Sequence, residues 1–310
     1  MRILCTGAGG YIGSVLVPHL LHCGHHVVAL DTYVYGINSL AACCHDPRFT
    51  PVRGDARDQR VLKLLLANAD AIIPLAAIVG MQACAADENA ALTTNYGAVK
   101  TLCDLASSFQ RIVFPNTNSG YGIGSDAECT EDSPLNPVSL YGKLKVAAEE
   151  IVMARPNSIA FRLATVFGAS PRMRVDLLLN DFVHRAVHDR ALVVFEGRFR
   201  RNFLHVRDAA SAFQHAIQNF DSMRGRVYNV GDSRTNMTKL DLCRRIETHV
   251  PGFVWMEAEH HTDVDKRDYV VSNARIEATG WRPERSLDEG ISELCKLYTT
   301  IKDRRFGNAT

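Results

Sequence analysis

The sequence predicts an α/β fold, in which helices cover both faces of a doubly wound parallel sheet and a smaller α/β lobe follows at the C-terminal end. Short apolar runs alternate with helix-length segments over the first half of the chain, and this alternation becomes irregular after about residue 167. Strand–helix alternation implies right-handed crossovers and a parallel sheet buried on both faces. With 310 residues and 46% hydrophobic residues, the chain is large enough to bury such a core.

Six short apolar runs bounded by polar or turn residues read as buried strands: residues 2–5, 26–31, 49–53, 71–75, 112–115 and 158–163. Segments with helical spacing lie between most of them: residues 12–23, 59–67, 89–108 and 141–154. We expect the sheet domain to span residues 1–167 and the smaller lobe residues 168–310. Residues 204–222 are expected to return to the sheet domain.

Composition excludes several classes of protein. Thirty-five Lys and Arg residues stand against 34 Asp and Glu residues, so no positive field exists to attract nucleic acid or an anionic membrane. No apolar run approaches the ~18 residues of a membrane span, and the Gly-rich N-terminus lacks the apolar centre of a secretory signal. The nine cysteines are scattered without a C-x-x-C pair, as for free thiols. We therefore expect a cytoplasmic protein.

A Gly-rich turn follows the first predicted strand and opens a helix. Gly7, Gly10 and Gly13 form G-x-x-G-x-x-G, with Tyr11 and Ile12 inside the motif. Small residues permit a tight turn and let backbone N–H groups approach a pyrophosphate, whose charge then faces the N-terminus of the helix. The turn therefore predicts a dinucleotide site.

An acidic residue ends the second predicted strand. Asp31 lies 18 residues after Gly13, close to the ~20 expected of the carboxylate that holds the ribose hydroxyls of a dinucleotide. No Arg or Lys occurs from residue 32 to 42 to receive a 2′-phosphate. A strand-end turn residue is the alternative interpretation, but the spacing favours NAD over NADP.

A tyrosine and a lysine share one face of the helix that follows the fifth strand. Tyr141 and Lys145 are four residues apart, and a polar turn at residues 116–122 ends the preceding strand. A Y-x-x-x-K pair arises often on helix surfaces. Its position at the sheet edge of a dinucleotide fold favours a catalytic pair.

These features together resemble the extended short-chain dehydrogenase/reductase family of nucleotide-sugar epimerases and dehydratases, over nearly the whole chain. Its T-G-x-x-G-x-x-G matches residues 6–13, and R-x-x-N-V-Y-G resembles residues 162–168, where Thr165 replaces the Asn. R-D-F-I-H-V-x-D resembles residues 201–208. The resemblance implies a Rossmann sheet that binds NAD, with further cofactor contacts from its G-D-x-x-D motif, its L-A-A strand end and a helix Asn, here Asp55, Ala56, Leu75, Ala76, Ala77 and Asn95.

The resemblance also implies three catalytic residues, Thr117, Tyr141 and Lys145. A tyrosine with a pKa of about 10 is only ~0.1% ionised at pH 7, so it needs nearby positive charge to act as a base. Lys145 and the nicotinamide ring would favour the phenolate. Tyr141 then takes the proton from a sugar hydroxyl while hydride leaves its carbon for NAD, and Thr117 hydrogen-bonds the same oxygen. Lys145 also holds the nicotinamide ribose.

Substrates of this family are sugars linked to a nucleoside diphosphate, here GDP or UDP, whose charge needs cationic partners. By motif position Arg201 and Arg267 correspond to diphosphate arginines, and Asn180 to a diphosphate-contacting Asn. Arg172, Arg174 and Arg200 are further candidates, and for each of the three a solvated surface position is equally open; Arg174 is the one taken as a substrate contact. The remaining predicted substrate contacts are Asn118, Ser119 and Phe195, of which Phe195 would line the base pocket or serve the core.

The residues after Thr117 bear on the reaction. In 4,6-dehydratases of this family an Asp-Glu pair stands there and carries out water elimination; here Asn118 and Ser119 cannot do that proton work. Residues 115–122, 162–168, 170–174 and 265–269 look most like 4-dehydrogenases that act on GDP-linked manno-heptose in surface-polysaccharide pathways. A UDP- or GDP-hexose 4-epimerase is the second reading, and a non-catalytic NAD-binding regulatory protein the remote one. An acid and base from elsewhere, such as Glu196 or His205, also stays open.

Two further expectations concern metals and assembly. The histidines around residue 24 and the His and Asp residues at 260–265 are better explained without a metal ion, and Cys43-Cys44 favours helix packing over a redox pair. The resemblance implies a homodimer, in which helices 89–108 and 141–154 pair with their copies across a twofold axis.

Overall fold

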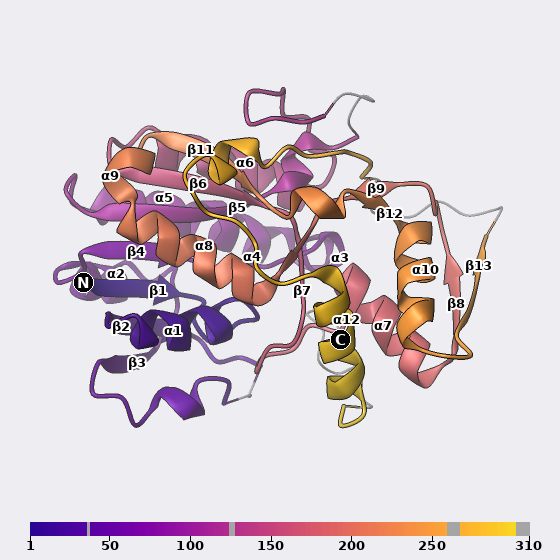
Figure 1. Cartoon of the computed structure of the whole chain (residues 1–310). Coiled ribbons are helices and arrows are strands. Elements are labelled where there is room, and N and C mark those ends of the chain that lie inside the picture. Colours follow the sequence, from indigo (N-terminus) through magenta and orange to yellow (C-terminus); the bar gives the residue numbers. More distant parts are fainter. Residues whose placement is uncertain (36–37, 124–127, 259–266, 302–310) are drawn as a thin grey trace.

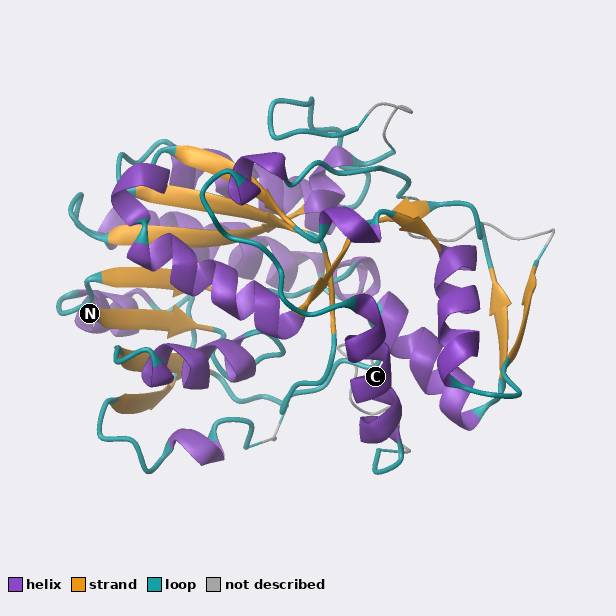
Figure 2. Ribbon diagram, viewed as in Figure 1, coloured by secondary structure: helices purple, strands orange, loops and turns teal. Residues whose placement is uncertain are grey.

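A seven-stranded parallel sheet forms the centre of the protein, with helices on both faces (Figures 1 and 2). The computed structural model describes residues 1–35, 38–123, 128–258 and 267–301. The predicted doubly wound parallel sheet is confirmed. Along the sheet the strands follow the order β11 (Arg226–Val230), β6 (Ser158–Leu163), β5 (Arg111–Thr117), β4 (Ala71–Pro74), β1 (Arg2–Thr6), β2 (His26–Asp31) and β3 (Phe49–Arg53).

Strand residues alternate between the two faces of the sheet, and each face has its own core. Ile3 and Cys5 of β1 pack in the cluster that includes α1 (Gly13–His22) and α8 (Val206–Gln218). Leu4, between them, packs in the cluster on the other face. That second face is covered by α2 (Gln59–Leu66), α5 (Ala98–Leu105) and α6 (Leu140–Met153). Because both faces are covered, the strands read as nearly continuous apolar runs.

The helix expected at residues 89–108 contains a π-helical turn. After α3 (Met81–Ala86), helix α4 covers Glu88–Leu92, the π-helical turn covers Thr93–Gly97, and α5 follows without a gap to Leu105. The predicted helical segment is therefore present and ends three residues earlier than expected. The π turn carries Asn95, whose side-chain amide bonds both backbone groups of Ile78, at 2.8 Å each.

The strand order reverses between β1 and β4, and this places the site. Loops after β1 and β4 diverge there at the carboxyl ends of the strands, which is where parallel sheets of this kind bind ligands. Asp31 at the end of β2 and Thr117 at the end of β5 belong to the same edge of the sheet.

The C-terminal part builds a smaller lobe of short sheets and helices beside this edge (Figure 1). Its strand pairs are β7 (Thr165–Phe167) with β10 (Phe203–His205), β9 (Arg200–Arg201) with β12 (Met237–Thr238), and β8 (Ala191–Val194) with β13 (Val254–Glu257). Its longer helices are α7 (Leu178–His188), α10 (Lys239–His249) and α12 (Leu287–Tyr298). Short turns complete the chain: Ala41–Cys43, Asn118–Tyr121, Phe220–Met223 (α9), Ser233–Thr235 and Ala274–Glu277 (α11).

More of the C-terminal part of the chain belongs to the main sheet domain than the sequence suggests. Helix α8, within residues 204–222, packs against α1, and β11 then adds a seventh strand beside β6. The sequence pattern alone leaves β11 in the C-terminal lobe. The division at residue 167 stays a prediction.

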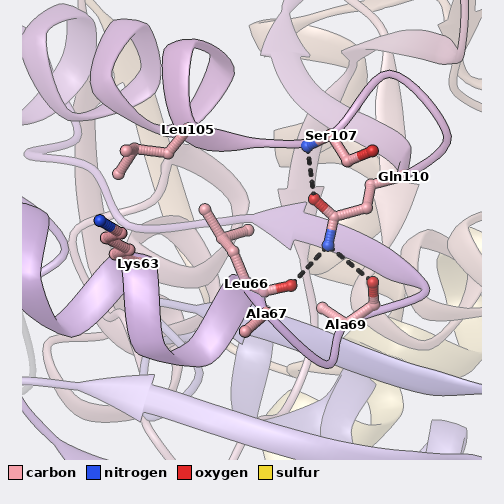
Figure 3. Close-up of a pocket in the computed structure, with 7 residues that line it drawn as sticks. All are labelled: Lys63, Leu66, Ala67, Ala69, Leu105, Ser107 and Gln110. Atoms are coloured by element: carbon pink, nitrogen blue, oxygen red, sulfur yellow. Dashed lines mark hydrogen bonds between the residues drawn. The ribbon is translucent and has the colours of Figure 1, made fainter.

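A surface hollow of about 290 Å³ lies at the opposite edge of the sheet, between the ends of α2 and α5 (Figure 3). Gln110 bridges it: its Nε2 donates to the carbonyl oxygens of Leu66 and Ala69, and its Oε1 accepts from the backbone N–H of Ser107. None of the residues that line it was predicted for the site. The hollow therefore plays no part in the chemistry considered below.

Candidate active site

The Gly-rich turn after β1 is too crowded for side chains. Gly7 has a φ of +67°, and a Cβ placed on it would lie 2.5 Å from the backbone nitrogen of Ala76. A Cβ on Gly13 would lie 2.4 Å from the carbonyl oxygen of Ala8. The turn therefore needs glycine at both positions, and its bare backbone leads straight into the N-terminus of α1.

The carboxylate of Asp31 is fixed beside this turn. One oxygen accepts the backbone N–H of Gly9 at 2.9 Å, and the other accepts that of Tyr33 at 2.8 Å. Each carboxylate oxygen keeps a further lone pair for a hydroxyl donor. Asp31 is half-buried, as a ribose-binding residue at the mouth of a site needs to be.

The loop after β4 is held against β1. The backbone N–H of Leu75 donates to the carbonyl of Thr6 at 2.9 Å, and that of Ala76 to the Thr6 hydroxyl at 3.3 Å. Asn95 holds the next turn of the loop through Ile78. The predicted cofactor residues on β1, β4 and the π turn thus form one continuous surface.

Asp55 and Ala56 follow β3 at the far side of the same edge. Asp55 forms an ion pair with Arg57 at 2.6 Å, and the backbone N–H of Gly54 donates to the carbonyl of Asp31 at 2.9 Å. Their position beside Asp31 is compatible with the cofactor contact expected of them, which stays a prediction.

Tyr11 ties the Gly-rich turn to the C-terminal lobe. Its hydroxyl donates to the carbonyl of Gly168 at 2.7 Å and accepts from the side-chain amide of Asn180 at 3.3 Å. The other bonds of the Asn180 amide go to the N–H of Gly168 and the carbonyl of Arg174. Asn180 is fully buried, so in this structure its amide holds the lobe together. The predicted diphosphate contact of Asn180 is untested.

Strand β5 runs further than predicted and delivers Thr117 at its last position. The Thr117 hydroxyl accepts the backbone N–H of Ser119 at 3.1 Å and donates to the Ser119 Oγ at 3.0 Å. Helix α6 begins beside this turn, with Ser139 capping the N–H of Gly142 at 3.1 Å. Tyr141 therefore stands in the first turn of the helix.

Lys145 lies one turn beyond Tyr141 on the same face of α6. It is buried, and its Nζ lies 4.1 Å from the centre of the Phe114 ring. Burial lowers the pKa of Lys145 to about 7, although the negative charge of Glu149 opposes this shift. In the protein without cofactor this lysine is therefore close to its point of half-protonation at neutral pH.

Two arginines act on Tyr141 through their charge. Burial raises the pKa of Tyr141 to about 12, while the guanidinium groups of Arg174 and Arg267 act in the opposite direction. Nη1 of Arg267 donates to the Ser119 Oγ, one hydrogen bond away from Thr117. Two predicted substrate arginines therefore lie within electrostatic reach of Tyr141, whose catalytic role stays a prediction.

The other predicted substrate residues differ in burial and in their contacts. Arg201 is buried in β9, with its guanidinium carbon 5.8 Å from the centre of the Tyr269 ring, so it packs against the segment that carries Arg267. Phe195 follows β8 at the outer side of the lobe, with 38% of its surface exposed, and its base-pocket role stays a prediction. Asn118 is buried, and among the described residues neither atom of its amide group has a hydrogen-bond partner.

A buried polar network lies behind the turn that follows Thr117, and its residues were not among those predicted from the sequence. Glu149 forms a 2.7 Å ion pair with Arg162 and accepts from the Asn116 amide. The Asn116 Oδ1 in turn accepts the backbone N–H of Thr117 at 2.8 Å. A signal for it exists in the sequence, because Glu149 continues the i, i+4 face of Tyr141 and Lys145, and Arg162 opens the R-x-x-N-like motif. The network holds the backbone at Thr117 in place.

The described part of the chain holds no cluster of three or more metal-ligating side chains, and it contains no helix long and apolar enough to cross a membrane. The His and Asp residues at 260–265 lie outside the described residues. All nine cysteines are described, and none forms a disulfide.

These residues fit a bound dinucleotide: Gly7 and Gly13 leave the room that its pyrophosphate requires, and the fixed Asp31 carboxylate suits ribose hydroxyls. A dinucleotide-binding sheet with a Tyr–Lys helix at its cleft defines a dehydrogenase-type enzyme. The chain belongs to the NAD-dependent epimerase/dehydratase family, whose model matches residues 3–231. It is an enzyme with NAD as its cofactor.

Known proteins of this family resemble the chain over nearly its full length. The low-salt glycan biosynthesis protein Agl12 of Haloferax volcanii is 31% identical over 96% of this chain and 98% of its own. A UDP-glucose 4-epimerase of Mycolicibacterium smegmatis is 29% identical, with the same two coverages. A dTDP-glucose 4,6-dehydratase of Streptomyces niveus is 27% identical over 96% of this chain and 93% of its own.

Solved structures show the same fold. The dTDP-glucose 4,6-dehydratase DesIV of Streptomyces venezuelae, solved with NAD, has a TM-score of 0.85 at 25% identity, with 97% of each chain covered. The UDP-glucuronic acid 4-epimerase of Bacillus cereus, solved with UDP-glucuronic acid and NAD, has a TM-score of 0.86 at 23% identity over 97% of this chain and 99% of its own.

Proposed function

We propose that this enzyme oxidises C4 of a nucleoside-diphosphate sugar with NAD and does not eliminate water from C5 and C6. One observation carries the proposal: the turn after Thr117 presents Asn118 and Ser119, neither of which titrates near neutral pH. We favour a 4-dehydrogenase of the GDP-manno-heptose kind, which releases the 4-keto sugar.

The proposed roles follow from the positions of the side chains. Tyr141 takes the proton of the C4 hydroxyl, and Thr117 donates a hydrogen bond to the same oxygen. NAD, when bound, accepts the hydride from C4. Arg174 and Arg267 stabilise the phenolate of Tyr141, because both guanidinium charges lower its pKa. Arg201 and Arg267 are the proposed partners of the sugar diphosphate.

Water elimination needs an acid and a base, and the carboxylates of Glu149 and Glu131 are engaged in other contacts. Glu149 is paired with Arg162, and one Glu131 oxygen accepts the backbone N–H of Asn229 at 2.8 Å. His205, one alternative considered above, has Nε2 2.7 Å from Glu293, while its Nδ1 accepts the backbone N–H of Arg207 at 3.2 Å. These contacts support a reaction that stops at C4 oxidation.

A hexose 4-epimerase is the second candidate. Epimerisation also needs no acid–base pair beside Thr117, because the 4-keto sugar only has to turn over and take the hydride back. The similarity of the chain to a UDP-glucose 4-epimerase, at 29% identity, fits this reading. The two functions differ in whether the hydride stays on the cofactor or returns to C4.

Deuterium at C4 separates the two. Substrates labelled at C4, GDP-manno-heptose and the GDP- and UDP-hexoses among them, are mixed with a stoichiometric amount of enzyme and quenched during the first turnover. A dehydrogenase leaves the deuterium on the reduced cofactor and yields an unlabelled 4-keto sugar. An epimerase returns it to C4 in inverted configuration. If no sugar of the panel transfers its C4 label, the proposed function is wrong.

We propose that the enzyme acts as a cytoplasmic homodimer. The thiol state of its nine cysteines supports a reducing compartment. Two helical segments of each chain, α4–α5 and α6, are proposed to pair with their copies across a twofold axis.

A further inference from the structure

The segment between β7 and α7, residues 168–177, passes the carboxyl ends of the sheet strands, where the dinucleotide site lies (Figure 1). The Ser170 Oγ donates to the carbonyl of Tyr11 at 2.7 Å and lies 2.8 Å from the Ser14 Oγ. The backbone N–H of Arg172 donates to the same Ser14 hydroxyl at 3.3 Å. These bonds fix the segment to the first turn of α1, directly after the Gly-rich turn.

The same segment continues to the other side of the site. Nη2 of Arg174 lies 4.0 Å from the position of a Cβ on Gly80, in the loop after β4. The segment therefore runs from α1 to the β4 loop, across the point where the strand order reverses. A dinucleotide bound at this edge has its pyrophosphate between these two loops.

The Arg172 side chain points to the loop after β2. Its guanidinium carbon lies 3.8 Å from the centre of the Tyr35 ring, and only 2% of the residue is exposed. Tyr33, in the same loop, lies against the Gly-rich turn, because its ring comes within 3.0 Å of the position of a Cβ on Gly9. Arg172 thus joins the C-terminal lobe to the loop that borders the pyrophosphate position.

A guanidinium buried to this extent gains from an anion. Burial lowers the pKa of Arg172 and the positive charge of Arg174 adds to this shift, whereas Tyr35 and Asp176 act in the opposite direction. Nη1 of Arg172 already donates to the carbonyl of Met173, so a phosphate would take the remaining donors of the fork. Arginine also presents a planar fork that matches the oxygens of a phosphate and stacks on aromatic rings. A pyrophosphate beside Arg172 would offset the cost of its burial.

We propose that Arg172 is a pyrophosphate-binding residue of the NAD site, and that its stacking on Tyr35 holds the β2 loop against the bound cofactor. The cation comes from the C-terminal lobe and not from the sheet domain. NAD then leaves only when Arg172 and Tyr35 separate, so we expect its release to be slow. This inference concerns the cofactor alone and does not depend on the identity of the sugar.

The test compares ligands with and without a pyrophosphate. Binding of adenosine, ADP and NAD to cofactor-free protein is measured by calorimetry for the unmodified chain, Arg172→Met and Arg172→Lys. Arg185→Met, which removes a half-exposed arginine paired with Asp181 at 2.8 Å, is the matched control. We expect Arg172→Met to raise the Kd of ADP and NAD at least ~10-fold, about 1.4 kcal/mol, and to leave adenosine unchanged. Arg172→Lys should recover part of the loss.

Equal weakening of all three ligands would show that Arg172 only shapes the loop, and an unchanged Kd for NAD would exclude any contact with the pyrophosphate. Either result overturns the proposal. If Arg172→Met does not fold, as judged by circular dichroism, the Arg172→Lys variant decides between the same outcomes. Tyr35→Leu changes a residue that is 49% exposed and should release NAD faster than the unmodified chain. An unchanged release rate contradicts the holding role of Tyr35.

Discussion

The Asp31 carboxylate accepts the backbone N–H of Gly9 at 2.9 Å, so the acid that ends β2 and the phosphate turn that follows β1 form one rigid unit. A carboxylate fixed in this place accepts from ribose hydroxyls and repels a 2′-phosphate. We therefore expect the Asp31 side chain to set the choice of NAD over NADP.

Asp31→Ala should weaken NAD binding at least ~10-fold, because two charge-assisted hydrogen bonds are lost. NADP binding should change much less or improve. Asp104→Ala, at an exposed ion pair with Lys100, is the control that should leave both affinities unchanged. If calorimetry on the unmodified protein shows NADP binding as tightly as NAD, the assignment of Asp31 is wrong.

Two glycine substitutions should give opposite results. Gly13→Ala places a Cβ 2.4 Å from the Ala8 carbonyl oxygen, so the Gly-rich turn must move, and NAD binding should be lost or strongly reduced. Gly97→Ala puts its Cβ in ordinary contact, 3.8 Å from the Leu92 carbonyl, with helical backbone angles. It should keep NAD binding and unfold at the same or a higher temperature. Normal NAD affinity in Gly13→Ala would contradict this account of the turn.

Tyr141→Phe keeps the ring and removes the proton acceptor. It should bind NAD and nucleotide sugar almost normally and lose at least ~100-fold in the rate of hydride transfer. Lys145→Met should lose a similar factor and also bind NAD less well. Lys143→Met, at an exposed position of the same helix, should have little effect. Rapid-quench measurement of C4 label transfer checks all three, and near-normal transfer in Tyr141→Phe would remove that residue from the proposed mechanism.

The buried Lys145 should make the stability of the cofactor-free protein depend on pH. Burial lowers its pKa from 10.5, the ordinary value for a lysine, to about 7 in the folded protein. Between these values the unfolded chain binds more protons, so the free energy of unfolding should rise with pH from 7 upward. Denaturant unfolding at pH 7.0 and 8.5 measures the slope. Lys145→Met should show a smaller rise than the unmodified protein and Lys143→Met; equal slopes would place the Lys145 pKa elsewhere.

The proposed homodimer makes a simple prediction. Light scattering over micromolar concentrations should report twice the chain mass, since helices that pair across a twofold axis form a self-complementary interface. A monomer throughout this range would contradict the proposed assembly.

Much of the fold could be predicted because it is written in local patterns. All six predicted strands occur in the parallel sheet, since each is a short apolar run with clear ends. The π-helical turn inside the helix expected at residues 89–108 could not be predicted in the same way. The π turn at Asn95 depends on two bonds to the backbone of Ile78, seventeen residues earlier, and helical spacing carries no trace of that contact.

The site residues also differ in whether local sequence patterns or long-range contacts determine their positions. Gly7, Asp31, Tyr141 and Lys145 belong to short motifs, so sequence spacing together with the family resemblance predicts them as candidates, and their roles stay predictions. The positions of Arg172 and Arg267 depend on the paths of long connections in the C-terminal lobe. Tertiary contacts set these paths: a stacked ring for Arg172 and the Ser119 hydroxyl for Arg267.

The mass of the product tests the central claim most directly. The enzyme is incubated with its nucleotide sugar, and the product is measured by mass spectrometry. Oxidation at C4 without elimination predicts either a 4-keto sugar, two hydrogens lighter than the substrate, or a 4-epimer of equal mass, each with its C6 oxygen retained. A 4-keto-6-deoxy sugar, lighter than the substrate by one water, would contradict the account if it were the main product. The acid and the base for elimination would then have to come from residues other than Asn118 and Ser119.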